Sequence, residues 1–245
     1  MSSSILAVMV SLGWLASAAP GEAALETETI RTSAGDLEIT FVGHGTLVFR
    51  FGGKVIHVDP VGRYADYAKM PKADVILVTH EHGDHLDPAT IEKIATENTV
   101  LVLTEACAKR LGRGVVMKNG DVKTVAGLKI EAVPAYNVVH MRGPGQPFHP
   151  KGVGNGYVIP FGDTRVYVAG DTENVPEMAA LGKIDVAFLP MNLPYTMTPE
   201  MVADAVRTIR PKLVYPYHFG ETDTSKLAEL LKGDLGVEVR VRKMQ

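Results

Sequence analysis

The most informative residues of the chain lie in one short segment, Thr79 to Asp87. It contains the pattern H-x-H-x-D-H, formed by His80, His82, Asp84 and His85. Neutral imidazole nitrogens and carboxylate oxygens are the ligands that a borderline divalent metal ion takes, and a tight turn can present several of them to one or two ions. The segment therefore predicts a metal site.

Two later segments place a further candidate ligand directly after an apolar strand. Residues 165–169 run into Asp171, and residues 212–217 run into His218. Alone, an aspartate at a turn is usually a turn former, and a single histidine is more often structural. Because both follow the H-x-H-x-D-H segment, we expect them to join the metal site, where the carboxylate could bridge two ions.

Short strands, with few helices, must position these residues. Residues 74–78 form an apolar run of the buried-strand type, and Asp87 and Pro88 predict the cap and first turn of a helix that ends at Glu97. Gly52-Gly53 predicts a hairpin turn. The other expected strands are residues 37–42, 46–51, 55–58, 100–103, 115–117, 128–133, 156–159, 165–169, 186–189, 213–215 and 237–241, and the other helices are residues 105–111, 199–209 and 225–231. Together they predict a layered α/β protein.

Three further motifs follow predicted strands: Gly43-His44-Gly45, Asp59-Pro60 and Gly170-Asp171-Thr172. With the histidine segment, they make the chain from about Leu37 to its C-terminus resemble the metallo-β-lactamase fold superfamily. Within it, the chain is most similar to the branch that includes L-ascorbate 6-phosphate lactonases and uncharacterised metal-dependent hydrolases. The resemblance implies an α/β fold, an αββα sandwich of two mixed β-sheets flanked by helices, with a dinuclear metal site at one edge.

The resemblance also implies which ion each ligand binds. The implied assignment is His80 and His82 on the first ion, Asp84, His85 and His218 on the second, and Asp171 between them. Two divalent ions follow from it, zinc first, with manganese or iron as alternatives.

The third histidine of the first ion departs from the commonest pattern of the superfamily. Many members place it directly after the corresponding strand, where this chain continues Pro134-Ala135-Tyr136-Asn137. The candidates are His149 and His140, with Asn137 as a weak carbonyl donor. We favour His149 because the proline and glycine residues around it would fix its loop, and because similar chains pair Ala-Tyr-Asn with a later His-Pro-Lys-Gly. Residues 134–156 form a long loop, which could wall the pocket.

Other polar residues could support the ligands or bind substrate. His44 and Asp59 are candidates to hold the metal ligands in place, although both also suit ordinary turns. Tyr136 and Tyr195 could donate a hydrogen bond to a developing oxyanion, but tyrosines in loops more often pack. His57, between apolar residues of a predicted strand, is expected to be structural.

The composition excludes several classes of protein. The chain has 245 residues, 46% of them hydrophobic and 22% charged, and a net charge of -3. This balance excludes disordered, collagen-like and polytopic membrane proteins. The acidic charge and the lack of a long basic run predict no nucleic-acid partner. The lone Cys107 reads as a small packed residue.

The N-terminal residues resemble a secretory signal peptide. An apolar run from Ile5 to Ala19 contains the small residues Ala16-Ser17-Ala18, typical of a cleavage site. We expect residues 1–24 to be removed on export to the periplasm or the medium, which would leave no stable membrane span. The remainder, 25–245, would form a single hydrolase domain.

The expected activity is that of a metal-dependent hydrolase. Two ions about 3.5–4 Å apart would lower the pKa of a bridging water to near neutrality, and the metal-bridging hydroxide would attack a small-molecule ester, lactone or phosphodiester. Asp84 is the candidate to orient this nucleophile and move its proton. The alternatives are a non-catalytic metal-containing binding or sensory module on the same fold and a nuclease-type phosphodiesterase. The sequence is also compatible with a homo-oligomer.

Overall fold

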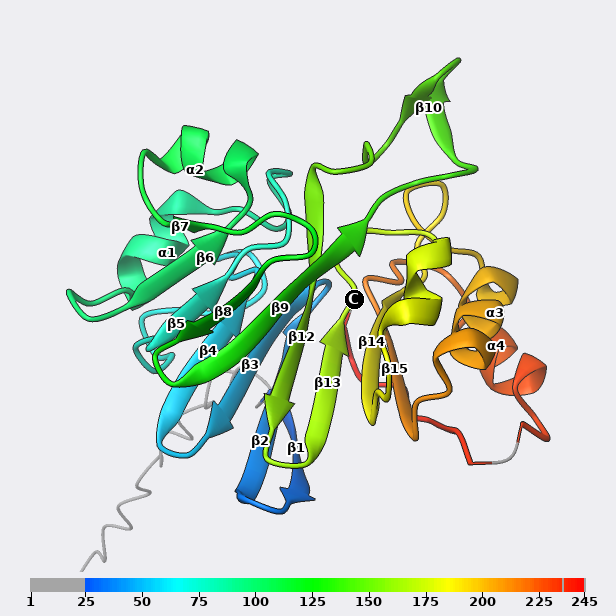
Figure 1. The fold of residues 1–245 in the computed structure, drawn as a ribbon, viewed down its shortest axis with the longest axis horizontal. Helices are drawn as coiled ribbons and strands as arrows, with labels where there is room; N and C mark the ends of the chain where they lie inside the picture. Colours follow the sequence, from blue (N-terminus) through cyan, green and yellow to red (C-terminus); the bar gives the residue numbers. More distant parts are fainter. Residues whose placement is uncertain (1–24, 235, 245) are drawn as a thin grey trace, which may run out of the picture.

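Two seven-stranded β-sheets lie face to face, and helices cover the outer face of each sheet (Figure 1). This arrangement is seen in a computed structural model that describes residues 25–234 and 236–244. It is the αββα sandwich expected from the sequence. The predicted signal peptide, residues 1–24, lies outside the described residues.

The first sheet contains β1 to β7 in chain order. Its strands are β1 (Glu26–Thr32), β2 (Gly35–Gly43), β3 (Thr46–Phe51), β4 (Lys54–Val58), β5 (Val75–Leu77), β6 (Val100–Leu103) and β7 (Val115–Val116). β1 to β4 are antiparallel neighbours, whereas β4 to β7 are parallel. Parallel neighbours need crossovers, two of which contain α1 (Pro88–Ile94) and α2 (Glu105–Leu111).

The second sheet has the order β16-β15-β14-β13-β12-β9-β8. Its strands are β8 (Val122–Val125), β9 (Leu128–Ala135), β12 (Gly154–Phe161), β13 (Thr164–Val168), β14 (Val186–Pro190), β15 (Leu213–Tyr217) and β16 (Glu238–Val239). The strands from β8 to β13 are antiparallel, and those from β13 to β16 are parallel. The helical segments that follow its strands are η1 (Pro176–Ala180), α3 (Pro199–Ile209) and α4 (Ser225–Leu230).

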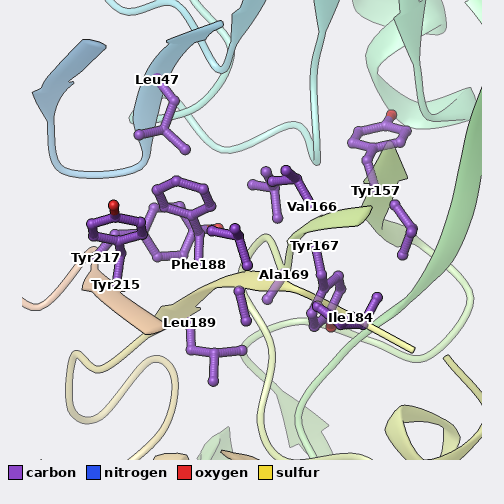
Figure 2. Close-up of a cluster of buried hydrophobic side chains, with 14 of the residues drawn as sticks. Leu47, Tyr157, Val166, Tyr167, Ala169, Ile184, Phe188, Leu189, Tyr215 and Tyr217 are labelled. Carbon is purple, nitrogen blue, oxygen red and sulfur yellow. The ribbon is translucent and has the colours of Figure 1, made fainter. Parts of the chain in front are cut away.

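The inner faces of the two sheets share one hydrophobic core. Phe41 of β2 packs on Tyr215 of β15 with ring centroids 5.0 Å apart, and Phe188 of β14 stacks on the same tyrosine at 5.0 Å. Figure 2 shows Phe188 and Tyr215 beside Leu47 of the first sheet. Burying each large apolar side chain stabilises the fold by about 1.5–3 kcal/mol. This packing fixes the sheets, and therefore their edges, relative to each other.

α1 and α3 begin where the sequence predicts, because their caps satisfy the first backbone N–H groups. Asp87 Oδ1 accepts from the N–H of Thr90 at the start of α1, and Thr198 Oγ1 accepts from that of Met201 at the start of α3. α1 ends at Ile94, before the predicted Glu97, because Ala95 has an extended backbone. None of the helices in the described ranges is long and apolar enough to cross a membrane.

Several elements were not predicted from the sequence. β1 has the sequence ETETIRT, in which Ile30 is the one apolar residue, so its position at the edge of the sheet gives no apolar alternation. β8 is exposed except for Val125. The loop before β12 also contains a hairpin of β10 (Met141–Gly143) and β11 (Gln146–Pro147). In the predicted strand 237–241, only Glu238–Val239 pair as β16.

Candidate metal centre

Strand ends of both sheets deliver the predicted ligands to one edge of the sandwich. The histidine segment follows β5, Asp171 follows β13 and His218 follows β15. β13, β14 and β15 are parallel neighbours, so their carboxyl ends meet at the same edge. His149 comes from the long loop that leads into β12.

Three imidazoles form the first cluster of candidate ligands. His82 Nδ1 lies 3.1 Å from His80 Nε2 and 3.2 Å from His149 Nε2, and Asp171 Oδ2 lies 3.3 Å from His149 Nε2. Four tetrahedral ligands at 2.0–2.1 Å from a zinc ion lie about 3.3 Å from one another. The spacing of these donors therefore fits a tetrahedral ion.

The second cluster lies on the other side of Asp171. Its carboxylate oxygens lie 3.4 Å from His85 Nε2 and 3.3 Å from His218 Nε2, and Asp84 Oδ2 is 3.9 and 3.7 Å from the same two nitrogens. His85 Nε2, His218 Nε2 and Asp171 Oδ1 are buried and have no hydrogen-bond partner among the described residues. Buried polar atoms are rarely left without a partner. Their convergence fits a second metal position.

Asp59 holds ligands of both clusters from behind. Its side chain is fully buried, lies 2.8 Å from His85 Nδ1 and accepts hydrogen bonds from the N–H and Oγ1 of Thr79. Thr79 Oγ1 in turn lies 3.0 Å from His80 Nδ1. Burial would lower the pKa of His85, but the carboxylates of Asp171 and Asp59 outweigh burial and raise it to about 9. These contacts hold the Nδ1 atoms of His80 and His85, so that their Nε2 atoms face the first and the second cluster, respectively.

The structure separates the two candidates for the third histidine. His149 lies in the first cluster, whereas His140 Nδ1 lies 2.7 Å from Glu173 Oε1. Asn137 Oδ1 accepts from the N–H of His149 and lies 2.8 Å from its Nδ1, so Asn137 holds His149 and its oxygen is already occupied. Asn137 Nδ2 donates to Glu173 Oε1 and to the carbonyl of Tyr195.

Glu173 is a supporting residue that the sequence interpretation missed. Its carboxylate is fully buried, and the backbone N–H groups of Val138, Val139 and His140 donate to it at 2.6, 2.6 and 2.7 Å. Burial would raise its pKa, but the hydrogen bonds from Asn137 and these N–H groups outweigh burial and lower it. The sequence feature that could have identified Glu173 is its position two residues after Asp171, but this position alone does not indicate what the residue does.

His44 contacts Asp84 at the entrance of the second cluster. His44 Nε2 lies 3.1 Å from Asp84 Oδ2, and its ring centroid lies 3.7 Å from that of His218. Burial lowers the pKa of His44, and the hydrogen bond with Asp84 offsets only part of this effect. His44 and His218 both have left-handed backbone, with φ of 53° and 47°. Such strain costs about 1–3 kcal/mol per residue and tends to cluster at functional sites.

The two candidate tyrosines lie in different places. The Tyr136 hydroxyl donates to Glu177 Oε2 at 2.8 Å, and the ammonium of Lys151 lies 4.8 Å from its ring centroid. The Tyr136 hydroxyl is therefore paired with Glu177, and Tyr136 is not among the residues that line the pocket. Tyr195 does line the pocket and is 45% exposed.

The clusters open into a cavity of about 600 Å³. Its lining comprises His44, His82, Gly83, Asp84, His149, Asp171 and His218, together with Arg142, Phe148, Asn192 and Tyr195. Three of these, Arg142, Phe148 and His149, belong to residues 136–153, the loop that connects β9 and β12. The loop therefore forms a wall of the pocket, as its length predicts.

Comparison with known proteins agrees with this fold and site. The family model described as a β-lactamase superfamily domain matches residues 38–218. A UPF0173 metal-dependent hydrolase of Pelotomaculum thermopropionicum is 31% identical over 222 residues, which cover 84% of this chain and 96% of the relative. The chain therefore belongs to the metallo-β-lactamase superfamily, among its metal-dependent hydrolases.

Solved structures place it in the same group. A protein of Parabacteroides distasonis named as a metal-dependent hydrolase is 47% identical, with a TM-score of 0.87 over 91% of this chain and all of that one. Igni18, a metallo hydrolase from Ignicoccus hospitalis, is 25% identical, with a TM-score of 0.71 over 85% of this chain and 96% of that one. The predictions of the fold and of a metal-dependent hydrolase are confirmed.

Proposed function

We propose that this enzyme uses two divalent metal ions, zinc in both positions, to hydrolyse a small-molecule ester, lactone or phosphodiester. The observation that carries the proposal is the arrangement of candidate ligands on both sides of Asp171. One carboxylate oxygen, Oδ2, lies 3.3 Å from both His149 Nε2 and His218 Nε2, and the other lies 3.4 Å from His85 Nε2. A carboxylate in this position suits a bridge between two ions.

The donor set supports zinc. His80, His82 and His149 would hold the first ion, Asp84, His85 and His218 the second, and Asp171 both. These groups offer imidazole nitrogen and carboxylate oxygen without a thiolate, a set that suits zinc and also admits manganese or iron. When bound, two such ions lower the pKa of water and stabilise negative charge that develops on the substrate.

Asp84 is the residue that we propose to orient the attacking water and accept its proton. Its side chain lines the pocket and is one-third exposed. Burial would raise the pKa of its carboxyl, but the nearby imidazole of His218 and the hydrogen-bonded imidazole of His44 outweigh burial and hold this pKa well below its ordinary range. Asp84 is therefore ionised at neutral pH, and His44 keeps it directed at the pocket. Tyr195, across the pocket, would donate a hydrogen bond to a developing oxyanion.

Substitution of the bridge tests the proposal. We expect the wild-type enzyme to contain two zinc ions and to hydrolyse members of a panel of lactones and phosphodiesters, including bis(p-nitrophenyl) phosphate. Asp171→Ala should lose both the metal, measured by elemental analysis, and this hydrolysis. Asp204→Ala is the matched control, because Asp204 lies on the exposed face of α3 and pairs with Arg207. Full activity in Asp171→Ala would exclude the two-metal scheme.

Export is the second part of the proposal. The apolar run and small residues within residues 1–24 support cleavage of a signal peptide and release of residues 25–245, as one hydrolase domain, into the periplasm or the medium. Amino-terminal sequencing of the natively expressed enzyme should find a start near Ala19 or Leu25. An intact Met1 or Ser2 would contradict export by cleavage.

A further inference from the structure

The β10–β11 hairpin carries an arginine that the proposed chemistry does not use. The hairpin projects from the body of the molecule beside the ligand edge of the sheets (Figure 1). Met141 pairs with Pro147 and Gly143 with Gln146, so Arg142 is the extra residue of a β-bulge. Bulges occur next to active sites, where they redirect a side chain. Here the bulge residue lines the metal pocket.

Aromatic contacts hold the Arg142 side chain at the pocket wall. One guanidinium nitrogen donates to the carbonyl of Phe148 at 3.2 Å, and the guanidinium carbon lies 5.4 Å from the centroid of the Phe148 ring. Phe148 packs edge-on against Tyr195 with centroids 5.1 Å apart. Stacking on an aromatic face restricts a guanidinium and leaves most of its N–H groups available.

The charges around Arg142 favour an anionic ligand. Among the residues that line this pocket, Arg142 is the one lysine or arginine. The carboxylates in the lining, Asp84 and Asp171, lie against the histidines of the clusters, and within the described ranges Arg142 makes no ion pair. A guanidinium fork binds a planar carboxylate through two parallel hydrogen bonds.

We propose that Arg142 binds a carboxylate of the substrate, at a distance from the bond that is hydrolysed, and so selects monoanionic esters or lactones. The inference rests on the proposed function, because it assigns a substrate class to the same pocket. A single guanidinium without a second lysine or arginine in the lining suits a monoanion better than a phosphate dianion. The pocket of about 600 Å³ has room for a small molecule that reaches from the metal ligands to the hairpin.

A pair of esters tests this assignment. The probes are mono-4-nitrophenyl adipate and its neutral analogue, in which an amide replaces the distal carboxylate. The wild-type holoenzyme should prefer the carboxylate, and Arg142→Gln should lower kcat/KM for it by about 10- to 100-fold, mainly through KM, because a charge-assisted pair is lost. The neutral ester should change less than about twofold. Arg113→Gln, which removes a surface arginine paired with Glu92, is the matched control.

Two outcomes would overturn the carboxylate site. One is an equal loss for both esters in Arg142→Gln, which would mean that Arg142 only supports Phe148. The other is a larger Arg142-dependent preference for 4-nitrophenyl 5-phosphonopentanoate, which would assign the site to a dianion.

Binding separates this inference from the proposed function. The uncleavable anilides that correspond to the two adipyl esters can be titrated calorimetrically into the holoenzyme and its variants. If neither ester is hydrolysed, the proposed function fails for esters, yet tighter binding of the carboxylate anilide that is lost in Arg142→Gln would still support the site. Hydrolysis of both esters without any preference would overturn the site and leave the proposed function standing. Equal binding of both anilides, whether or not the esters are hydrolysed, would also overturn the carboxylate site.

Discussion

At the scale of residues, the buried side chains of Asp59 and His57 differ in how many hydrogen bonds their polar atoms make. The oxygens of Asp59 accept several hydrogen bonds although the residue is fully buried. His57 is also fully buried, but its Nε2 contacts only the carbonyl of Pro71, at 3.1 Å, and its Nδ1 has no hydrogen-bond partner among the described residues. Burial therefore disfavours the imidazolium and lowers the pKa of His57 to about 4.

The low pKa of His57 predicts a loss of stability in acid. In the unfolded chain its pKa is about 6.5. Between these values the unfolded state binds a proton that the folded state does not, so the free energy of unfolding should fall as the pH drops from about 6.5 to about 4. For this residue the loss approaches about 3 kcal/mol. Urea unfolding of the metal-free enzyme at pH 7.5 and 4.5 measures it.

His57→Gln isolates this contribution. Glutamine can still donate to the Pro71 carbonyl but does not titrate, so the variant should lose about 2–3 kcal/mol less than the wild-type chain between the two pH values. Comparison at both pH values removes any constant cost of the substitution. An identical pH dependence in the two proteins would show that His57 does not titrate as its burial implies.

At the scale of elements, the loop of residues 136–153 between β9 and β12 depends on one carboxylate. Glu173, which follows β13, accepts hydrogen bonds from three successive backbone N–H groups at the base of this loop and from Asn137. Asn137 in turn contacts His149. The strand end that carries Asp171 therefore also positions the loop that carries His149.

We expect Glu173→Gln to loosen this loop. A glutamine amide offers one acceptor oxygen and would point its NH₂ group at N–H groups that need an acceptor, so Asn137 and His149 should shift. Loss of such support lowers metal affinity by about 10- to 100-fold. Competition with a chromophoric zinc chelator measures the affinity, and hydrogen exchange of residues 138–140 reports the loop.

Glu177→Gln is the control for this prediction. Glu177 accepts from the Tyr136 hydroxyl and pairs with Lys151, without contact to the N–H groups of the loop base. This variant should keep the zinc affinity of the wild-type enzyme. Unchanged affinity and unchanged exchange in Glu173→Gln would remove Glu173 from the support of His149.

Elements differ in how far the sequence predicts them. α1 and α3 could be predicted because Asp87 and Thr198 cap them through local hydrogen bonds. β1 could not, because its pairing with β2 comes from backbone hydrogen bonds that leave no apolar pattern in Glu26–Thr32. The hairpin that carries Arg142 was missed for a similar reason, since its pairs are short and mostly exposed.

The candidate site divides in the same way. His80, Asp171 and His218 each follow an apolar strand. This pattern predicted that they would meet at one edge, because each residue is fixed by its own strand. The interactions of His140 and Glu173 depend on how the long loop folds back onto β13, which spacing along the chain does not encode. Sequence spacing predicted the residues on strand ends better than those on loops.

At the scale of the whole molecule, the candidate ligands divide between the two sheets. The segment with His80 and His85 follows β5 of the first sheet, whereas His149, Asp171 and His218 adjoin strands of the second. Neither sheet carries a complete set for either proposed ion. The core between the sheets, which includes Phe41 and Tyr215, must therefore form before the ligands can meet.

This division sets the order in which the enzyme can mature. His218 is synthesised after all the other candidate ligands, and it reaches the edge only when β15 has joined its sheet. A nascent chain that ends after β7 would carry the whole H-x-H-x-D-H segment and still lack Asp171 and His149. The full set of candidate ligands can therefore meet only after β15 has been made and the sandwich has closed. For an exported chain, the ions would have to come from the compartment in which it folds.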